Sequence, residues 1–151
     1  MGNQSFAVEP SLDHRPSNNM LRRAPLFSGM TDRTLQAVAE LADEVEYVRG
    51  ESIVREGDEG DAFYILSDGV AVVEQEERAI RTLSAGAFFG EISLIDGKPR
   101  SASVIATQSV RAVRVSRAGF QRLLDEHPSV RLELLMALTE RLRKVAPNPT
   151  D

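Results

Sequence analysis

Residues 88–102 combine the residue types that a phosphate-binding loop needs. Gly90 stands before a predicted short helical turn, and such a turn can point backbone N–H groups at an anion. Further along, Arg100 offers a planar guanidinium that can hold two acceptor oxygens at once. Glu91 lies between them, and an ionised carboxylate only accepts hydrogen bonds, so it suits a hydroxyl group and not a phosphate. This segment, which we call the cassette, therefore predicts a small anion site with a hydroxyl-binding group beside it.

Each of these three residues also has a simpler interpretation. Gly90 could be the turn residue of any strand-to-helix junction, Glu91 a charge in the first turn of a helix, and Arg100 a solvated surface arginine. Their occurrence together, at this spacing and within one short segment, favours the ligand-binding interpretation.

Length and composition predict one ordinary domain without a metal centre. The 151 residues are 42% apolar, which is enough for one core of ordinary size. The chain has no cysteine, which excludes disulfides, thiolate metal sites and cysteine nucleophiles. The histidines are His14, in a polar N-terminal stretch, and His127, at a predicted helix end, so we expect no metal and no catalytic cluster.

The charge pattern argues against nucleic acid as a direct partner. The net charge is −5, and the 18 basic residues are scattered among 23 acidic ones instead of forming a basic patch. No apolar run approaches the roughly 18 residues of a membrane span. The first residues also lack a basic and then apolar signal sequence, so we expect a cytoplasmic protein.

The elements that must position the cassette are short strands. Between about residues 45 and 115, brief alternating apolar runs are separated by turns rich in glycine and aspartate. The predicted strands are 45–48, 52–55, 62–66, 70–74, 80–83, 101–106 and 110–115. A series of seven or eight such strands predicts a mainly β domain, an eight-stranded jelly-roll β-barrel.

One N-terminal and two C-terminal helices are predicted to flank the strands. Thr31 can cap the first of them, and Ser116 opens the second, which ends at His127. The third begins near residue 129 and carries an apolar row made by Leu135, Leu138, Leu142 and Val145. This spacing fits packing against the core or a lid, and it also fits a homodimer seam.

The two ends of the chain differ in composition from its middle. Residues 1–19 contain prolines and asparagines with few periodic apolar positions, which is typical of a disordered tail. Prolines in residues 147–151 stop any helix, so this stretch is a C-terminal tail or the start of a linker. We therefore expect residues 20–146 to form the folded domain.

The element order, with the cassette embedded late in the strands, resembles the cyclic nucleotide-binding domain family. This family includes the catabolite activator protein, the regulatory subunit of cyclic AMP-dependent protein kinase and the nucleotide-gated channels. The resemblance covers about residues 24–146 and includes Pro25-Leu26-Phe27 and the turn at 56–61. Its specific part is Phe89-Gly90-Glu91-Ile92-Ser93-Leu94, followed by Pro99-Arg100-Ser101-Ala102.

The resemblance implies a cyclic nucleotide ligand, with Glu91 on the ribose 2′-hydroxyl and Arg100 on the cyclic phosphate. The other ligand-binding positions that it implies are Gly90, Ile92, Ser93, Ser101 and Ala102. For the base pocket it implies Val73, Ile80, Arg141 and Leu142, although the first two also fit simple core filling and Arg141 fits a solvated helix charge. In the family, threonine after the arginine often accompanies cyclic GMP; Ser101 is smaller, so we expect cyclic AMP, with cyclic GMP possible.

The function that follows is a non-catalytic sensor whose last helix changes its packing when the nucleotide binds. An effector protein, or an effector domain missing from this sequence, would then respond to the changed packing of this helix. Three alternatives remain open. The chain could be the sensor fragment of a catabolite-activator-type transcription factor, or a degenerate member that binds no nucleotide. A metal-binding cupin enzyme shares the strand pattern but would need a histidine cluster.

Overall fold

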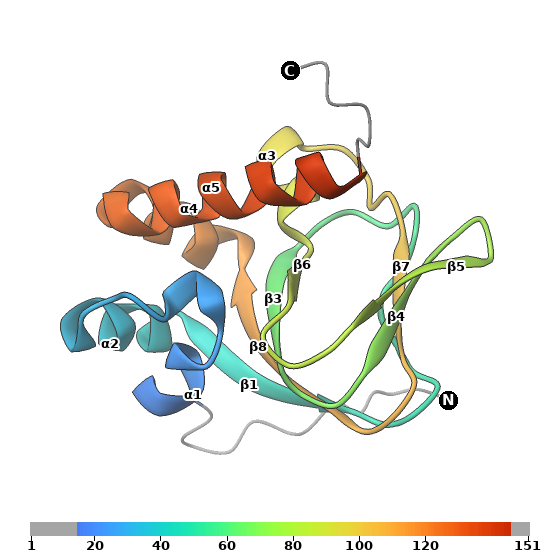
Figure 1. Ribbon diagram of the computed structural model, residues 1–151, viewed down its shortest axis with the longest axis horizontal. Helices are drawn as coiled ribbons and strands as arrows, with labels where there is room; N and C mark the ends of the chain where they lie inside the picture. Colours follow the sequence, from blue (N-terminus) through green and yellow to red (C-terminus); the bar gives the residue numbers. More distant parts are fainter. Residues whose placement is uncertain (1–14, 146–151) are drawn as a thin grey trace.

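A computed structural model describes residues 15–145, which form a mainly β domain flanked by helices (Figure 1). The strands are β1 (Ala42–Tyr47), β2 (Ser52–Val54), β3 (Ala62–Asp68), β4 (Ala71–Gln75), β5 (Arg78–Leu83), β6 (Phe88–Phe89), β7 (Ser103–Ala106) and β8 (Val110–Ser116). The helices are α1 (Asn18–Arg22), the 3-10 helix η1 (Pro25–Phe27), α2 (Asp32–Glu40), α3 (Glu91–Asp96), α4 (Arg117–Glu126) and α5 (Pro128–Val145). The predicted C-terminal tail, 147–151, lies outside the described residues, as do residues 1–14 of the predicted N-terminal tail.

The strands form two four-stranded antiparallel sheets. The first has the order β1-β8-β3-β6, and the second has the order β2-β7-β4-β5. Eight strands agree with the sequence prediction, but within residues 15–145 no ladder joins the two sheets, so the predicted closed barrel is not shown. Strand β6 was missing from the predicted runs because two residues are too few to display an alternation.

Strand β3 carries the core on both of its faces, because successive side chains of a strand point to opposite sides. Phe63 and Ile65 pack with the helices, whereas Tyr64 and Leu66 pack between the two sheets. The ring of Phe63 lies 5.2 Å, centroid to centroid, from the ring of Phe120 in α4. The sheet that ends in β6 is thereby packed against the helices, and β6 forms the start of the cassette.

The N-terminal part contains more helix than the sequence predicted. Helix α2 begins after Thr31, as predicted, and the Thr31 side chain caps it. Helix α1 precedes it and begins at Asn18, inside the stretch 1–19 that was assigned to the tail. Ser17 caps α1, and Leu21 of α1 is only 1% exposed. A short capped helix with one buried leucine was too brief for its periodicity to be seen in the sequence.

The residues of helix α5 that face the core differ from the predicted apolar row. Leu134 is buried and Leu138 packs partly against the core, whereas Leu135 and Leu142 are 62% and 64% exposed. The side chain of Val145 lies outside the described part of the structure. The helix packs on α4 and η1, and Leu134 faces the core where Leu135 was expected, since adjacent helical residues point about 100° apart. The prediction that this row packs in the core is therefore wrong for Leu135 and Leu142.

Helix α5 also closes one end of the molecule. In Figure 1 it runs across the top of the view, over α4, and its C-terminal half passes beside α3. The last turns of α5 are thus brought next to the cassette, far from it in the sequence. None of the helices described for residues 15–145 combines the length and the apolar character that a membrane crossing requires.

Candidate functional site

The cassette borders a cavity between the second sheet, α3 and the end of α5. Its lining comprises Val54, Val73, Arg81, Phe89, Gly90, Glu91, Ile92, Ser93, Arg100, Ser101, Ala102, Val104 and Arg141. All of the predicted ligand-binding positions of the cassette are in this lining, together with Val73 and Arg141 from the predicted base pocket. Two predicted base-pocket residues, Ile80 and Leu142, are not. We call this space the cassette cavity.

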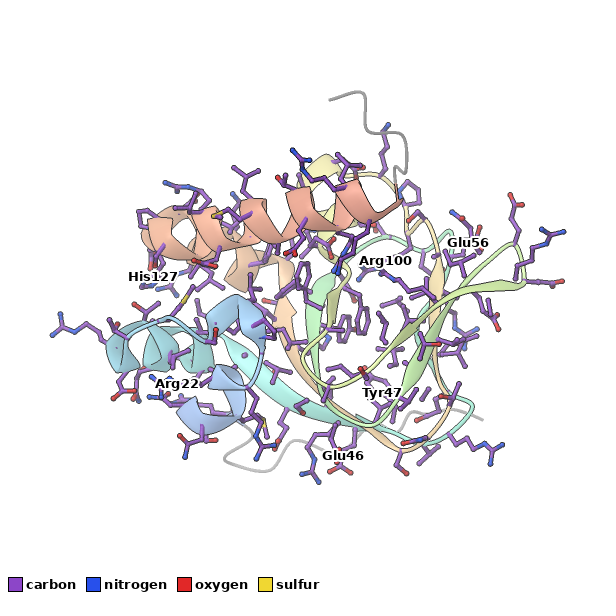
Figure 2. All side chains as sticks on the ribbon, viewed as in Figure 1. Arg22, Glu46, Tyr47, Glu56, Arg100 and His127 are labelled. Carbon is purple, nitrogen blue, oxygen red and sulfur yellow. The ribbon has the colours of Figure 1, made fainter. Side chains whose placement is uncertain are left out.

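Arg100 is fixed inside the molecule and is not a solvated surface arginine, since it is only 5% exposed. Its Nη1 donates to the Gly90 carbonyl at 2.9 Å, and its Nη2 donates to the Ala62 carbonyl at 2.8 Å. The Asp61 carboxylate lies 3.5 Å from Nη2. Figure 2 shows the side chain between α5 and the strands. These acceptors hold one side of the guanidinium, so its remaining N–H groups can meet an anion in the cavity.

Gly90 allows the guanidinium to lie this close to the backbone. Its φ is 91°, in the left-handed region that costs other residues about 1–2 kcal/mol. A Cβ at this position would lie 2.9 Å from both Arg100 Nη1 and the Ala62 carbonyl oxygen. The sequence suggested that Gly90 lets the backbone approach a ligand; in the structure its smallness also makes room for the arginine and the neighbouring strand.

Glu91 is a buried carboxylate with one oxygen in use and one without a partner. The residue is 1% exposed, and its Oε2 accepts a hydrogen bond from Arg141 Nη1 at 2.9 Å. Its Oε1 is buried and has no hydrogen-bond partner among residues 15–145. Burial raises the pKa of Glu91, while the nearby Arg141 and, more weakly, Arg81 and Arg100 lower it. A buried acceptor left alone costs about 1–3 kcal/mol, so a ligand hydroxyl that donates to Oε1 would be stabilised there.

Arg141 brings the C-terminal helix into contact with the cassette. Besides its bond to Glu91, it donates from Nη2 to the Phe88 carbonyl at 3.0 Å. Its guanidinium carbon lies 4.2 Å from the centroid of the Phe88 ring, which is a cation–π distance. Its side chain is 25% exposed, so it is not the solvated helix charge that the sequence also allowed. Helix α5 and the Glu91 carboxylate are therefore directly connected.

Strand β5 contributes Arg81 to the cavity and not Ile80. The β4–β5 ladder pairs Val73 with Arg81, so these two side chains share a face. The register shifts next to this pair, which leaves Ile80 as the extra residue of a bulge, and Ile80 is 56% exposed. Ile80 therefore lies outside the cavity lining, and its role in a base pocket stays a prediction. Alternation counted back from the buried Leu83 would have found Arg81, since residues two apart on a strand share a face.

The comparison with protein families agrees with this geometry. The family model described as the cyclic nucleotide-binding domain matches residues 44–127, which is more than half of the chain. The chain belongs to the cyclic nucleotide-binding domain family. This family is a regulatory module and is not catalytic.

The relatives of this cyclic nucleotide-binding domain are longer proteins. The chain is 40% identical over 106 residues to the cAMP-dependent protein kinase regulatory subunit of Emericella nidulans, covering 69% of this chain and 26% of the relative. It is 28% identical over 139 residues to the CRP-like cAMP-activated global transcriptional regulator of Mycobacterium tuberculosis, covering 89% of this chain and 62% of the relative. Among solved structures, cAMP-bound PfPKA-R has a TM-score of 0.74 and 34% identity, with 85% of this chain and 44% of that chain covered.

The remaining predicted residues of the cyclic nucleotide-binding domain differ in their exposure. Ser93 is buried, whereas Ile92 is 50% exposed even though it borders the cavity. Ser101 and Ala102 lie at the cavity where strand β7 is about to begin. Leu142 is outside the lining because adjacent residues of a helix point about 100° apart, and Arg141 takes the inward direction. The role of Leu142 in a base pocket stays a prediction.

His127, the histidine within the described part of the chain, does not line this site. His14 lies outside the described residues, and His127 is the C-cap of α4. Within residues 15–145 no cluster of histidine, aspartate and glutamate has the arrangement of a metal site. The chemistry of the cavity therefore comes from Arg100, Glu91, Arg141 and Arg81.

Proposed function

We propose that this domain binds a purine 3′,5′-cyclic nucleotide, in the first place cyclic AMP, and passes the signal on through α5. The observation that carries the proposal is the pairing of two buried groups at one cavity. These groups are Arg100, which has free donors, and Glu91, whose Oε1 lacks a partner. A cyclic nucleotide presents a hydroxyl donor and an anionic phosphate on one ribose ring, so a single ligand satisfies both. Cyclic AMP is favoured by the small Ser101 and by the names of the relatives.

The phosphate half of this proposal rests on how Arg100 is held. A buried monoanion is tolerable only when it is paired and hydrogen-bonded. The carbonyls of Gly90 and Ala62 already orient the guanidinium, so little side-chain freedom is lost when the ligand arrives. The Ser101 hydroxyl and the N–H groups of Ile92 and Ala102 supply the other phosphate contacts.

The signalling half rests on Arg141. A ribose hydroxyl that donates to Glu91 meets a carboxylate that already accepts a hydrogen bond from Arg141. A ligand can shift α5 only as far as it favours one packing of the helix over another. Because Arg141 joins α5 to the carboxylate that receives the ribose, the bound nucleotide acts on the packing of α5 through this pair.

The outward side of α5 is the surface that a partner would contact. It carries four large apolar side chains that are more than half exposed: Leu132, Leu135, Met136 and Leu142. The chain covers about a quarter of the kinase regulatory subunit and under two thirds of the transcriptional regulator. An effector protein or a further domain is the first candidate for the partner at this surface. A second copy of the chain is the other candidate. Sedimentation equilibrium with and without nucleotide separates these cases, because only a homodimer changes mass with protein concentration alone.

Isothermal titration calorimetry tests the binding proposal. The wild-type protein is titrated with cyclic AMP, cyclic GMP and, as a control ligand, linear 5′-AMP. We expect Arg100→Met to weaken cyclic AMP binding by about 2–5 kcal/mol and Glu91→Gln by about 1–3 kcal/mol. Arg78→Met is the matched control, because Arg78 is exposed on β5 and does not line the cavity.

Two results would contradict the proposal. If Arg100→Met bound cyclic AMP as tightly as the wild type while remaining folded by circular dichroism, the phosphate assignment would be wrong. If the folded wild type bound neither cyclic nucleotide, the chain would be a family member that keeps the fold and has lost the ligand.

A further inference from the structure

The Asp61 carboxylate lies between two arginines, and one of them is outside the cassette cavity. Its Oδ1 is 3.5 Å from Arg100 Nη2, and its Oδ2 is 3.4 Å from Arg114 Nη2. Arg100 borders the cavity, whereas Arg114, on β8, is not part of the cavity lining. One carboxylate is therefore divided between the arginine that faces the ligand space and an arginine that does not.

The backbone around Asp61 is tied to the start of α4. The Arg117 N–H donates to the Asp61 carbonyl at 3.0 Å, and Arg117 Nη2 donates to the Gly60 carbonyl. The next carbonyl along the chain, that of Ala62, accepts a hydrogen bond from Arg100. Because the main chain is held at these points, the Asp61 carboxylate changes partners by rotation of its own side chain.

Arg114 is held in place by aromatic residues between the sheets. Strand β3 places Tyr64 opposite Arg114 on β8 and opposite Phe89 on β6. The rings of Tyr64 and Phe89 stack with centroids 5.1 Å apart, and the Tyr64 hydroxyl accepts a hydrogen bond from Arg114 Nε at 3.4 Å. Burial lowers the pKa of Arg114, but Tyr64 and other neighbouring groups, Asp61 among them, raise it by more. A fixed positive charge therefore faces the second oxygen of Asp61.

The phosphate of a cyclic nucleotide would compete with Asp61 for the guanidinium of Arg100. A guanidinium has five N–H donors, and the carbonyls of Gly90 and Ala62 already accept from two of them. A carboxylate that turned fully toward Arg100 could accept two parallel N–H bonds, the favoured geometry of an arginine and carboxylate pair. These donors would then be lost to the phosphate, and the negative charge of Asp61 would repel it.

We propose that Arg114 is a positioning residue of the phosphate site, which keeps the Asp61 carboxylate from pairing fully with Arg100. The proposal rests on the proposed function, since the ligand is the cyclic nucleotide held by Arg100. Arg114 touches no ligand in this assignment; it holds one oxygen of Asp61, so that Arg100 keeps N–H donors for the phosphate. The Asp61 side chain is 70% exposed, so water screens its ion pairs and the effect on affinity is moderate.

Calorimetry with cyclic AMP tests this role by comparing one substitution in two backgrounds. Arg114→Met keeps a long side chain and removes the charge, and we expect it to raise the dissociation constant about 3- to 10-fold. In a protein that carries Asp61→Asn, which removes the carboxylate charge, the same substitution should raise the dissociation constant less than about twofold. Arg114→Gln keeps a donor for the Tyr64 hydroxyl without the charge, and it should behave as Arg114→Met does if that variant folds poorly.

The matched control is Arg111→Met. Arg111 lies on the same strand and pairs with Glu46 at 3.0 Å, but neither residue lines the cavity. Its loss removes the same charge from β8 and from an ion pair of the same kind. We therefore expect Arg111→Met to bind cyclic AMP with the dissociation constant of the wild type.

Ionic strength provides a readout that a general loss of stability would not change. Because the Asp61 side chain is mostly exposed, salt screens its pull on Arg100 and its repulsion of the phosphate. The ratio of the dissociation constants of Arg114→Met and the wild type should therefore fall as the salt concentration rises from about 0.05 M to about 0.5 M. A ratio that stayed constant would overturn the proposal.

The remaining outcomes separate this proposal from the proposed function. Equal effects of Arg114→Met in the two backgrounds would overturn the proposal, because Arg114 would then act without Asp61. A crystal structure of ligand-free Arg114→Met should show both Asp61 carboxylate oxygens within hydrogen-bond distance of Arg100, and a carboxylate turned into solvent would overturn the proposal. If the folded wild type bound no cyclic nucleotide, the proposed function would fail, and this crystal structure would still decide whether Arg114 restrains Asp61.

Discussion

The ion pair between Arg141 and Glu91 predicts a measurable energetic link between α5 and the cassette before any ligand binds. Arg141→Met keeps a long, unbranched side chain that suits a helix but removes the guanidinium. The variant leaves the Glu91 carboxylate, which is 1% exposed, without its ion-pair partner. A buried charge that loses its partner destabilises the folded state, so we expect the free energy of unfolding to fall.

The magnitude follows from the contacts of the Arg141 guanidinium. A hydrogen bond to a charged group contributes about 1.5–3 kcal/mol, and the 2.9 Å bond to Glu91 belongs at the lower end because the Arg141 side chain is 25% exposed. The contact with the Phe88 ring at 4.2 Å adds about 0.5–1 kcal/mol. We therefore expect Arg141→Met to lower the free energy of unfolding by about 2–3 kcal/mol.

A double-mutant cycle isolates the pair from the rest of the helix. Urea unfolding is followed by circular dichroism for the wild type, Arg141→Met, Glu91→Gln and the double variant, and the coupling energy is expected to be about 1–2 kcal/mol. Arg122→Met serves as the control. Arg122 pairs with Glu126 on the exposed side of α4 at 3.3 Å, and its loss should change stability by less than about 0.5 kcal/mol.

The reasoning is refuted if the two single effects simply add within about 0.5 kcal/mol. It is also refuted if Arg141→Met costs no more stability than Arg122→Met. In either case α5 would be held by its apolar residues alone, and the proposed route from the ribose to the helix through Glu91 would lose its physical basis.

Three further predictions concern the cassette and the core. Gly90→Ala should lower stability by about 2–3 kcal/mol in thermal unfolding, because a left-handed φ and a Cβ 2.9 Å from the arginine act together; an unchanged melting temperature would contradict this. Burial raises the pKa of Glu91 above its ordinary 4.5, so the folded state binds this proton more tightly than the unfolded state does. The stabilisation from this group is therefore complete below about pH 4.5, and it is lost as the pH rises through the raised pKa. Relative to Glu91→Gln, the wild type should therefore lose stability in urea unfolding as the pH rises above about 4.5, and a constant difference would refute the assignment. Phe63→Ala should lower the free energy of unfolding by about 3–5 kcal/mol, whereas Leu132→Ala, at a position 56% exposed, should change it little; equal effects would show that the core has been misplaced.

Local patterns in the sequence were sufficient for the elements and for most of the cassette. Thr31 and Ser116 cap α2 and α4 as predicted, because a cap depends on residues within one turn. Gly90 and Arg100 are 10 residues apart, on either side of the short helix α3, so their spacing already indicated a shared site. The contribution of Asp61 and Ala62 to holding Arg100 was not visible, because it depends on which strands lie side by side.

Ile80 and Leu142 lie outside the cavity lining for related reasons. They were assigned by position, but a bulge in β5 and the direction of the α5 side chains place Arg81 and Arg141 at the cavity instead. A bulge moves a side chain to the other face of a strand, and a quarter turn moves a different residue to the inner side of a helix. Neither change leaves a clear signal in a short segment of sequence.

The amino-acid sequence by itself determined the chemical groups available to a ligand: a glycine, a carboxylate and an arginine within one short segment, with no histidine or cysteine cluster to compete with them. Tertiary structure alone decided that Glu91 is buried, that one of its oxygens lacks a partner, and that Arg141, 50 residues away, occupies the other. The physical reason is that burial, strand register and helix rotation are set by the packing of the whole core. Residue types within a segment are a local property, whereas the partners of a buried charge depend on every element that packs around it.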